Sequence, residues 1–260
     1  MNEVAIPVSG GLDSTIAVYY AKQQGLKPVP FYVDLGHPYR WKERAALERI
    51  DLDPLLLDLS PLYEAIEHRL KNQIIPSRNL LFAVLGGMLA PRIWIAALDG
   101  EQLGKEHDKS PRFFRDTTTL LTWINEFFTP STVVETPFAN MSKAEVVGWA
   151  LEHGIDREML FQTSSCYSPD HEKCGVCLTC YKRWAAFKLN DVDEPGYTND
   201  PWKSEYAQEM RREIPKALLA GDFSRFTPKR IREHYKLMEK MGVPVSEEEL
   251  ATLEELELTE

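Results

Sequence analysis

The chain has 260 residues, of which 43% are hydrophobic and 27% are charged, so it can bury a sizeable core and is not a disordered chain. Thirty basic residues against forty acidic ones leave a formal net charge of −10, which argues against a broad nucleic-acid-binding surface. No run of roughly 18 apolar residues occurs and the N-terminus lacks a signal-peptide pattern, so we expect a soluble, cytoplasmic protein without a membrane span.

Strand and helix signals alternate through the first part of the chain. The predicted strands, rich in Val, Ile and Leu, cover Val4–Val8, Pro28–Asp34, Pro54–Leu59, Arg92–Leu98 and Thr132–Glu135. The predicted helices between them lie near Ser14–Gly25, Tyr39–Ile50, Pro61–Asn72, Asn79–Ala90 and Thr117–Phe128. This alternation predicts an α/β fold with a doubly wound, mainly parallel five-stranded sheet.

The rest of the chain is predicted to be helical. A helix follows the capping-box pattern that starts at Ser142, and another covers about Leu178–Lys188. Residues 189–201 are polar and rich in helix breakers, so we predict a linker there. The predicted domains are therefore residues 1–188, with a small cysteine lobe at about 160–188, and a helical C-terminal extension at residues 202–260. The helices of this extension lie near Trp202–Ala220, Pro228–Met241 and Ser246–Leu258.

A glycine-rich turn directly follows the first predicted strand and reads Ser9-Gly10-Gly11-Leu12-Asp13-Ser14. Glycines permit backbone torsions and close approaches that a side chain would block, and the free N–H groups of the next helix favour an anion there. The hydroxyls of Ser9 and Ser14 can add donors, while Asp13 is best placed to hold a magnesium ion or to orient a donor. An ordinary strand–turn–helix connection with Ser14 as the N-cap is the alternative.

Four cysteines, the only ones in the chain, lie close together at Cys166, Cys174, Cys177 and Cys180. Disulfides that stabilise a secreted fold would be spread along the chain, so the clustering favours a metal site. Four thiolates suit structural zinc, with an iron–sulfur cluster as the main alternative and a redox dithiol as a further one. His171 lies in the loop between the first two cysteines, but four cysteines already complete the shell of ligands.

The turn resembles the fingerprint of the PP-loop ATP pyrophosphatase superfamily, whose members use ATP to adenylate an oxygen and release pyrophosphate. This resemblance implies that the β,γ-phosphates of ATP are surrounded by Ser9, Gly10, Gly11, Asp13 and Ser14, within an ATP-binding stretch that also includes Val8, Leu12 and Thr15. Lys143 stands where many members carry a lysine that reaches the phosphates, so Asp13 and Lys143 are the expected catalytic residues. A solvated residue in the first helical turn is the alternative for Lys143.

The turn and the cysteine cluster together resemble the 7-cyano-7-deazaguanine synthase (QueC) family over roughly residues 3–188. Two further stretches carry the resemblance: Pro76-Ser77-Arg78-Asn79-Leu80-Leu81-Phe82, and Thr136-Pro137-Phe138 through Lys143-Ala144-Glu145. The resemblance implies an ATP-dependent ligase that adenylates 7-carboxy-7-deazaguanine, forms the amide with ammonia, and reaches the nitrile by a second activation. It also implies ATP, Mg²⁺ and Zn²⁺ as cofactors and favours a homodimer.

The same resemblance suggests a substrate pocket. It places Arg78 and Asn79 near the substrate, with a helix-capping pair as the alternative. The family's Y-P-D-C-R element, associated with the deazapurine pocket, is replaced here by Asp108–Asp116, so we place Arg112 and Phe114 among the substrate residues. This departure and the added helical extension suggest a variant reaction, in which the activated carboxylate is joined to an amine of a partner protein or of another acceptor.

Two other function classes remain open. A PP-loop tRNA thiolase requires sulfur chemistry and a basic tRNA surface, which the clustered cysteines and the net charge of −10 do not favour. A non-catalytic nucleotide-binding module would bind ATP without releasing AMP or pyrophosphate.

Overall fold

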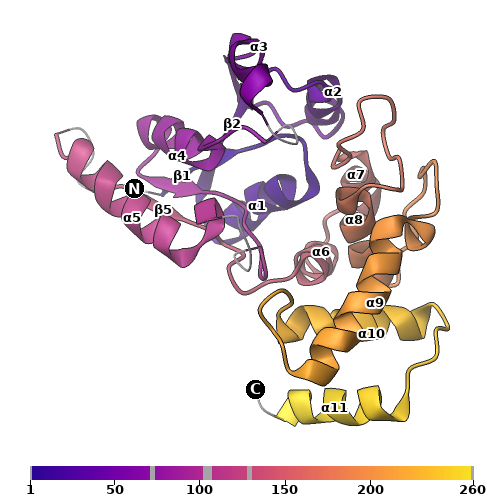
Figure 1. Cartoon of the computed structure of the whole chain (residues 1–260). Coiled ribbons are helices and arrows are strands. Elements are labelled where there is room, and N and C mark those ends of the chain that lie inside the picture. Colours follow the sequence, from indigo (N-terminus) through magenta and orange to yellow (C-terminus); the bar gives the residue numbers. More distant parts are fainter. Residues whose placement is uncertain (1, 71–73, 102–106, 128–130, 259–260) are drawn as a thin grey trace. The chain divides into compact units, whose positions relative to one another are not determined.

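The computed structural model describes residues 2–70, 74–101, 107–127 and 131–258 (Figure 1). Its strands are β1 (Glu3–Pro7), β2 (Lys27–Asp34), β3 (Leu55–Asp58), β4 (Arg92–Trp94) and β5 (Val133–Glu135). They form one sheet in the order β3-β2-β1-β4-β5, and every neighbouring pair is parallel. The predicted α/β fold with a parallel five-stranded sheet is confirmed. Because β1 is central, the turn that follows it lies at the carboxyl edge of the sheet, where ligands bind in such folds.

Helices connect these strands and make up the C-terminal part of the chain. The α-helices are α1 (Leu12–Gln23), α2 (Arg40–Arg49), α3 (Pro61–Ile66), α4 (Arg78–Leu89), α5 (Pro111–Ile124), α6 (Lys143–Glu152), α7 (Arg157–Gln162), α8 (Leu178–Leu189), α9 (Glu205–Ala220), α10 (Pro228–Lys240) and α11 (Glu247–Leu258). Short 3₁₀ helices cover Glu67–Arg69, His107–Lys109 and Pro201–Lys203. The predicted helix ends at Asn72 and Phe128 lie outside the described residues.

Several predicted boundaries were wrong. Helix α3 ends at Ile66 and α5 ends at Ile124, both earlier than predicted, and three further differences each involve a local hydrogen bond. Helix α1 begins at Leu12, since Gly11 is its N-cap and the Ser14 hydroxyl donates to the Gly11 carbonyl at 3.2 Å. Helix α5 begins at Pro111 rather than Thr117, because the Ser110 side chain accepts from the N–H of Phe113. Strand β4 ends at Trp94 rather than Leu98, and beyond it the N–H of Ala97 donates to the Ile95 carbonyl at 2.8 Å. Helix α7 was not predicted.

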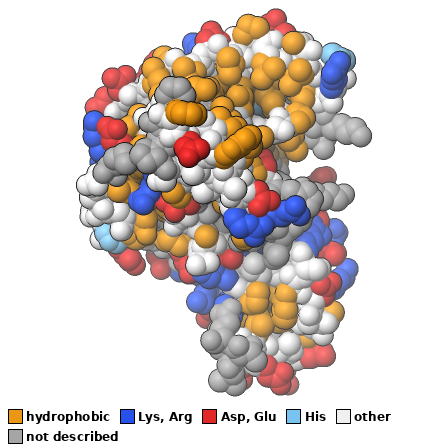
Figure 2. Space-filling view, turned by 90° about the vertical axis from the view of Figure 1, so that its left-hand side faces the viewer, with side chains coloured by type: hydrophobic (Ala, Val, Ile, Leu, Met, Phe, Trp, Pro, Cys, Tyr) orange, Lys and Arg blue, Asp and Glu red, His pale blue; other side chains and the backbone are white. Residues whose placement is uncertain are grey.

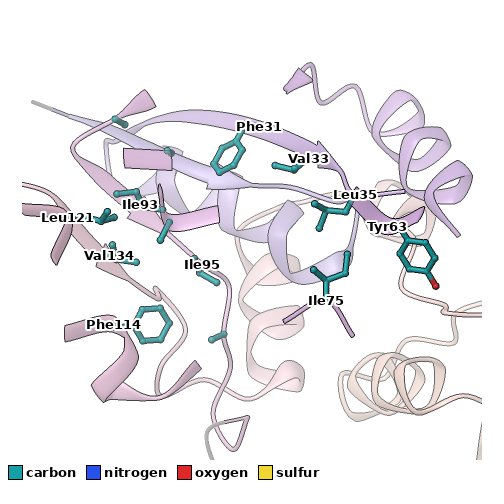
Figure 3. Close-up of a cluster of buried hydrophobic side chains, with 14 residues drawn as sticks. Phe31, Val33, Leu35, Tyr63, Ile75, Ile93, Ile95, Phe114, Leu121 and Val134 are labelled. Carbon is teal, nitrogen blue, oxygen red and sulfur yellow. The ribbon is translucent and has the colours of Figure 1, made fainter. Parts of the chain in front are cut away.

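The core of the sheet is a cluster of buried apolar side chains, which include Phe31, Val33, Ile93 and Val134 (Figure 3). They lie on the parallel strands β2, β4 and β5 and pack together with residues of α4 and α5. A Cβ atom on Gly86 of α4 would lie 2.9 Å from Cγ2 of Ile93, so this helix packs directly on β4. Burial of this apolar surface is the main force that fixes the sheet, and so the turn after β1.

The chain divides into two compact units. The first comprises residues 1–97, 106–139 and 150–165 and contains all five strands. The second comprises residues 98–105, 140–149 and 166–260 and contains the four cysteines. The two units are divided at other residues than the predicted boundaries at 188 and 202. The predicted division into domains stays a prediction.

Within the second unit, the helices of the C-terminal segment have an apolar core of their own. Met210 and Ile214 of α9 pack with Ile231 and Tyr235 of α10, and Tyr181 of α8 belongs to the same cluster. Figure 1 shows α9, α10 and α11 as successive helices at the C-terminal end of the chain. The extension is therefore a packed structure around α8.

Some large apolar side chains of the first unit are exposed. Met88 on α4 is 76% exposed and Trp123 on α5 is 73% exposed. Figure 2, viewed from the α5 side, shows hydrophobic side chains gathered over the upper part of this face. Among the described residues, no helix has both the length and the apolar character needed to cross a membrane.

Candidate functional site

The turn between β1 and α1 can adopt its conformation only because Gly10 lacks a side chain. Gly10 has φ +67°, and a Cβ atom there would lie 2.8 Å from the Cβ of Ala46 and 2.9 Å from the carbonyl oxygen of Glu43. The backbone is held from two sides, since Ser164 donates its N–H to the Gly10 carbonyl and Val8 donates to that of Phe31, both at 2.8 Å. The turn is therefore a rigid, closely packed element.

The start of α1 offers backbone donors beside this turn. The first intrahelical bond runs from the N–H of Thr15 to the Gly11 carbonyl at 3.0 Å, and the N-cap Gly11 has no side chain to cap the helix. The N–H groups of Leu12, Asp13 and Ser14 precede that bond and have no acceptor within the helix. Such groups, with the positive end of the helix dipole, favour a phosphate. Ser9, Gly11, Asp13 and Ser14 are partly exposed rather than buried in the core.

Ionisable side chains gather at the carboxyl end of β2. Asp34, the last residue of that strand, is 2% exposed and pairs with Arg44 at 2.9 Å. His37 is 5% exposed, stacks on Tyr39 with ring centroids 4.8 Å apart, and neither of its ring nitrogens has a hydrogen-bond partner among the described residues. Burial, together with the charge of Arg78, lowers the pKa of His37 to about 4, so its imidazole is neutral at pH 7.

Glu43 and Arg78 extend this group of side chains. The hydroxyl of Tyr32 donates to Glu43 at 3.0 Å, and burial raises the pKa of Glu43 to about 7 although the charge of Arg78 lowers it. Arg78 opens α4 after Ser77, which has φ +60°, and the Arg78 Nε is buried without a partner among the described residues. Unpaired buried donors and acceptors of this kind are costly and point to a ligand that satisfies them.

The predicted substrate residues have different surroundings in the structure. Asn79 is 4% exposed, and its amide donates to the Asp108 carbonyl at 3.2 Å. Phe114 packs in the hydrophobic core of Figure 3, whereas Arg112 has an 82% exposed side chain that pairs with Asp116 at 3.1 Å. A role in substrate binding stays a prediction for these three residues. The sequence analysis missed His37 and Glu43, although a polar stretch directly after a buried strand could have indicated them.

Lys143 belongs to the second unit and is the first residue of α6. The predicted capping box is present: Glu145 donates its N–H to the Ser142 hydroxyl at 3.1 Å, and the Glu145 carboxylate accepts from the N–H of Ser142 at 2.7 Å. Lys143 lines a cavity of about 100 Å³ together with residues of α8, α9 and α10.

The four cysteines of the second unit converge on one point. Their Sγ atoms all lie within 4.8 Å of one another, and Cys166, Cys174 and Cys180 are less than 5% exposed. Cys177 caps α8, and its Sγ accepts from the N–H of Cys180 at 3.4 Å. Hydrogen bonding by the neighbouring thiols holds the pKa of Cys177 well below its usual range, which favours the thiolate that binds metals. This donor set fits a metal ion with four sulfur ligands.

Comparison with known proteins identifies the family. The family model described as "Queuosine biosynthesis protein QueC" matches residues 54–191. The 7-cyano-7-deazaguanine synthase of Methanoculleus marisnigri is 30% identical over 224 residues, which cover 75% of this chain and 98% of that protein. The chain belongs to the QueC family. As a QueC-family member it is an enzyme that uses ATP to form a carbon–nitrogen bond.

Other similarities of this QueC-family chain are less complete. The 7-cyano-7-deazaguanine synthase 2 of Sulfurisphaera tokodaii is 28% identical over 225 residues, which are 75% of this chain but 47% of that protein. The chain thus spans about half the length of that relative. NMN synthetase from Francisella tularensis is a more distant solved structure, with 11% identity and a TM-score of 0.35 over 99% of this chain and 84% of that one.

Proposed function

We propose that the chain adenylates the carboxylate of 7-carboxy-7-deazaguanine, or a closely similar acid, and then joins it to an amine. The turn from Ser9 to Thr15 carries this proposal, because its Gly10 conformation and the N–H groups of the first turn of α1 suit the phosphates of ATP. The relationship to the QueC family suggests which acid is the substrate, since relatives are named for the 7-cyano-7-deazaguanine that they make.

In the first step a carboxylate oxygen attacks the α-phosphorus of ATP, the bond from that phosphorus to the bridging oxygen breaks, and pyrophosphate leaves. The N–H groups of the turn hold the departing phosphates, and Lys143 adds a positive charge. Asp13 is the proposed ligand of Mg²⁺, which would neutralise charge on the phosphates. In such a site, positioning and charge stabilisation supply nearly all of the rate enhancement.

In the second step the amine nitrogen forms a bond to the acyl carbon, the bond from that carbon to the AMP oxygen breaks, and AMP leaves. With ammonia the product is the amide, and adenylation of the amide oxygen followed by loss of AMP gives the nitrile. An amine with one carbon substituent on nitrogen gives a secondary amide, which cannot become a nitrile. The replaced Y-P-D-C-R element motivates this second outcome, with an amine of a protein or another molecule as acceptor.

His37, Glu43 and Arg78 are proposed to recognise the deazapurine. A guanine-like base presents adjacent donors and acceptors, and this group offers the His37 imidazole and the Arg78 Nε, both without partners among the described residues, beside the Glu43 carboxyl group that accepts from Tyr32. The cysteine cluster is proposed to hold zinc in a closed structural site. A homodimer also stays a proposal.

The test is product analysis of the purified chain with ATP, Mg²⁺ and 7-carboxy-7-deazaguanine. Without an amine we expect exchange of labelled pyrophosphate into ATP, and with ammonium we expect AMP and a product mass that identifies the amide or the nitrile. Asp13→Asn should lower kcat about 100-fold or more, since loss of one preorganised group at a developing charge has that effect. Asp53→Asn, which removes an equal charge from an exposed position, should leave kcat unchanged. Binding of ATP without exchange would contradict the proposal and indicate a non-catalytic module.

A further inference from the structure

An apolar face lies on the solvent side of α4 and α5 in the first unit. A Cβ atom on Gly87 of α4 would lie 3.4 Å from the amide nitrogen of Asn125 and 3.7 Å from Cδ1 of Leu121, so the two helices pack closely at this end. Figure 2 is viewed from this side and shows hydrophobic side chains gathered on it. We call this surface the α4–α5 face, formed by the exposed side chains of Met88, Leu120, Trp123, Ile124 and Phe127.

The exposed area of this face is large. Phe127 is 95% exposed, Met88 is 76% exposed and Trp123 is 73% exposed. Since a large aromatic side chain has about 150–250 Å² of surface, the five side chains together expose roughly 600 Å². That equals or exceeds the largest apolar patch of a typical monomer, about 300–600 Å², and approaches the roughly 800 Å² that each partner contributes to a standard interface. The face is therefore large enough to form most of a stable contact.

The two helices carry no charge in the middle of this face. No charged residue occurs in Asn79–Pro91, which includes most of α4, or in Thr117–Asn125 of α5 and its C-cap. Leu121 is buried in the core, and Trp123, two residues later, points to the opposite side of α5, because successive helical residues are about 100° apart. A helix that is apolar on its solvent side as well as on its core side is typical of one that is covered on both sides.

Charged side chains lie at the two ends of α5, and the two ends have opposite sign. Near its start, Arg112 and Arg115 both pair with Asp116 at 3.1 Å, and two positive charges against one negative charge leave this end positive. Past its end, Glu126 is exposed and is the one charged residue in the sequence between Ile124 and Ser131. The face is thus positive at one end, neutral in the middle and negative at the other end.

A face with this distribution of charge complements a second copy of itself. When two α5 helices pack antiparallel about a twofold axis near Leu120 and Leu121, the Arg115 end of each copy meets the Glu126 end of the other. The opposed helix dipoles favour the same orientation, and a twofold contact needs only one patch, which both copies supply. Because each chain has a net charge of −10, two copies approach most easily through a surface without excess negative charge.

We propose that the α4–α5 face is the contact between two copies of this chain. The two α5 helices lie antiparallel, with Trp123 of both copies near the centre and Arg115 of each copy paired with the partner's Glu126. The contact does not depend on the proposed reaction, so it can be tested on the purified chain without any substrate.

The mass in solution is the first measurement. By sedimentation the chain should have twice its own mass of 29.8 kDa. Trp123→Glu should raise the dissociation constant of the dimer at least about 30-fold, the effect expected for loss of a central aromatic residue. Trp41→Glu is the matched control, since Trp41 is 45% exposed on α2 and lies outside the face, and it should leave the dimer unchanged. A chain that is monomeric at every concentration, or a dimer that Trp123→Glu leaves intact, would overturn the proposal.

Reversal of the end charges tests the antiparallel orientation. Arg115→Glu and Glu126→Arg should each weaken the dimer about tenfold, because each places like charges opposite one another at both ends. An equimolar mixture of the two variants should dimerise as tightly as the unaltered chain, since one end of the mixed dimer then has the original ion pair and the other end has the reversed pair. The variant with both changes should dimerise equally well. Absence of rescue in the mixture and in the double variant would overturn this orientation.

A lipid surface is the other occupant that an exposed apolar face could take. Phosphatidylcholine vesicles are the probe, with the unaltered chain and Trp123→Glu compared by co-sedimentation. A dimer that does not bind the vesicles supports the proposal. A monomer that binds them through Trp123 would assign the face to lipid and overturn the contact between two copies.

Discussion

Gly10 lies in the proposed phosphate-binding turn and packs directly against α2. Its positive φ is tolerated by glycine at no steric cost, and its missing Cβ makes room for the Glu43 carbonyl and Ala46. Gly25, at the end of α1, has a similar φ of +71°, but a Cβ atom there would meet nothing within 4 Å. A comparison of the two glycines therefore distinguishes the effect of the positive φ, which both share, from the effect of the missing Cβ atom, which matters only at Gly10.

Gly10→Ala is predicted to destabilise the chain by about 3–4 kcal/mol, of which about 1–2 kcal/mol comes from the left-handed backbone and the rest from overpacking. Gly25→Ala should lower the free energy of unfolding by only the about 1–2 kcal/mol that comes from the left-handed backbone. Urea unfolding of both variants measures the difference, and adenylation should be lost in Gly10→Ala alone. Equal unfolding free energies for the two variants would show that the close approach to α2 does not matter.

At the scale of elements, the segment after α8 is held by a buried charge cluster. Glu194 accepts from Arg183 at 2.6 Å and from Lys173 at 2.6 Å, and both Glu194 and Arg183 are almost completely buried. Tyr197 also donates to Glu194 at 2.5 Å. Residues 189–201, predicted to be a linker from their composition, are thereby tied to the cysteine lobe and to α8.

Glu194→Gln is predicted to cost about 3–5 kcal/mol, because it leaves the Arg183 guanidinium buried without its counter-charge. Asp193→Asn is the adjacent control: Asp193 pairs with Lys188 at 2.7 Å, but its side chain is 85% exposed, so the loss should be about 1 kcal/mol or less. Chemical denaturation of the two variants gives the comparison. A small effect at both positions would mean that water or a neighbouring group replaces the ion pair.

The cysteine cluster also acts at the scale of elements, because it connects the loop that begins at Cys166 to the start of α8. We predict that the purified chain contains one zinc ion, that Cys177→Ser loses most of it, and that a strong chelator lowers the Tm of the unaltered protein. His171→Gln should keep the metal, since His171 is not part of the group of convergent ligand atoms. Elemental analysis and thermal unfolding are the measurements. Iron in place of zinc would restore the alternative of an iron–sulfur cluster.

At the scale of the whole molecule, the side chains that the structure describes include a deeply buried neutral histidine in each compact unit, His37 in the first and His234 in the second. Both have pKa values of about 4, below the unfolded value of about 6.5. Between these pH values the unfolded chain binds more protons than the folded chain. The contribution of each histidine to stability is therefore full above the unfolded value and lost as the pH falls towards 4.

Acidification from pH 7 to pH 5 is predicted to remove about 2 kcal/mol of stability for each of these histidines. Glu43, with a pKa of about 7, acts in the opposite direction, so the histidines must be judged from variants. His37→Gln and His234→Leu should each reduce the stability lost on acidification by the contribution of one histidine. His153→Gln, at an exposed position, should not change it. Urea unfolding at both pH values decides this, and identical pH dependence in all four proteins would contradict it.

The parts of the fold that were predicted correctly are those with local sequence signals. Short apolar runs, the glycine turn and the spacing of the cysteines are each readable within a few residues, and they indicated the parallel sheet and a convergence of four cysteines that could hold a metal. The start of α5 was misplaced, although Ser110 and Pro111 form a local N-cap signal. The candidate substrate residues were assigned from a resemblance in sequence, which carries no information on whether a side chain such as Phe114 is buried in a core.

By itself the sequence determined the strand–turn–helix that suits a phosphate, the four-cysteine ligand set and the family, because each depends on residues close together in the chain. Only the tertiary structure brought His37 of the loop after β2 near Arg78 of α4, and His234 of α10 into one cavity with Lys143 of α6. The physical reason is burial: packing decides which distant polar groups lose water together, and no local pattern encodes that.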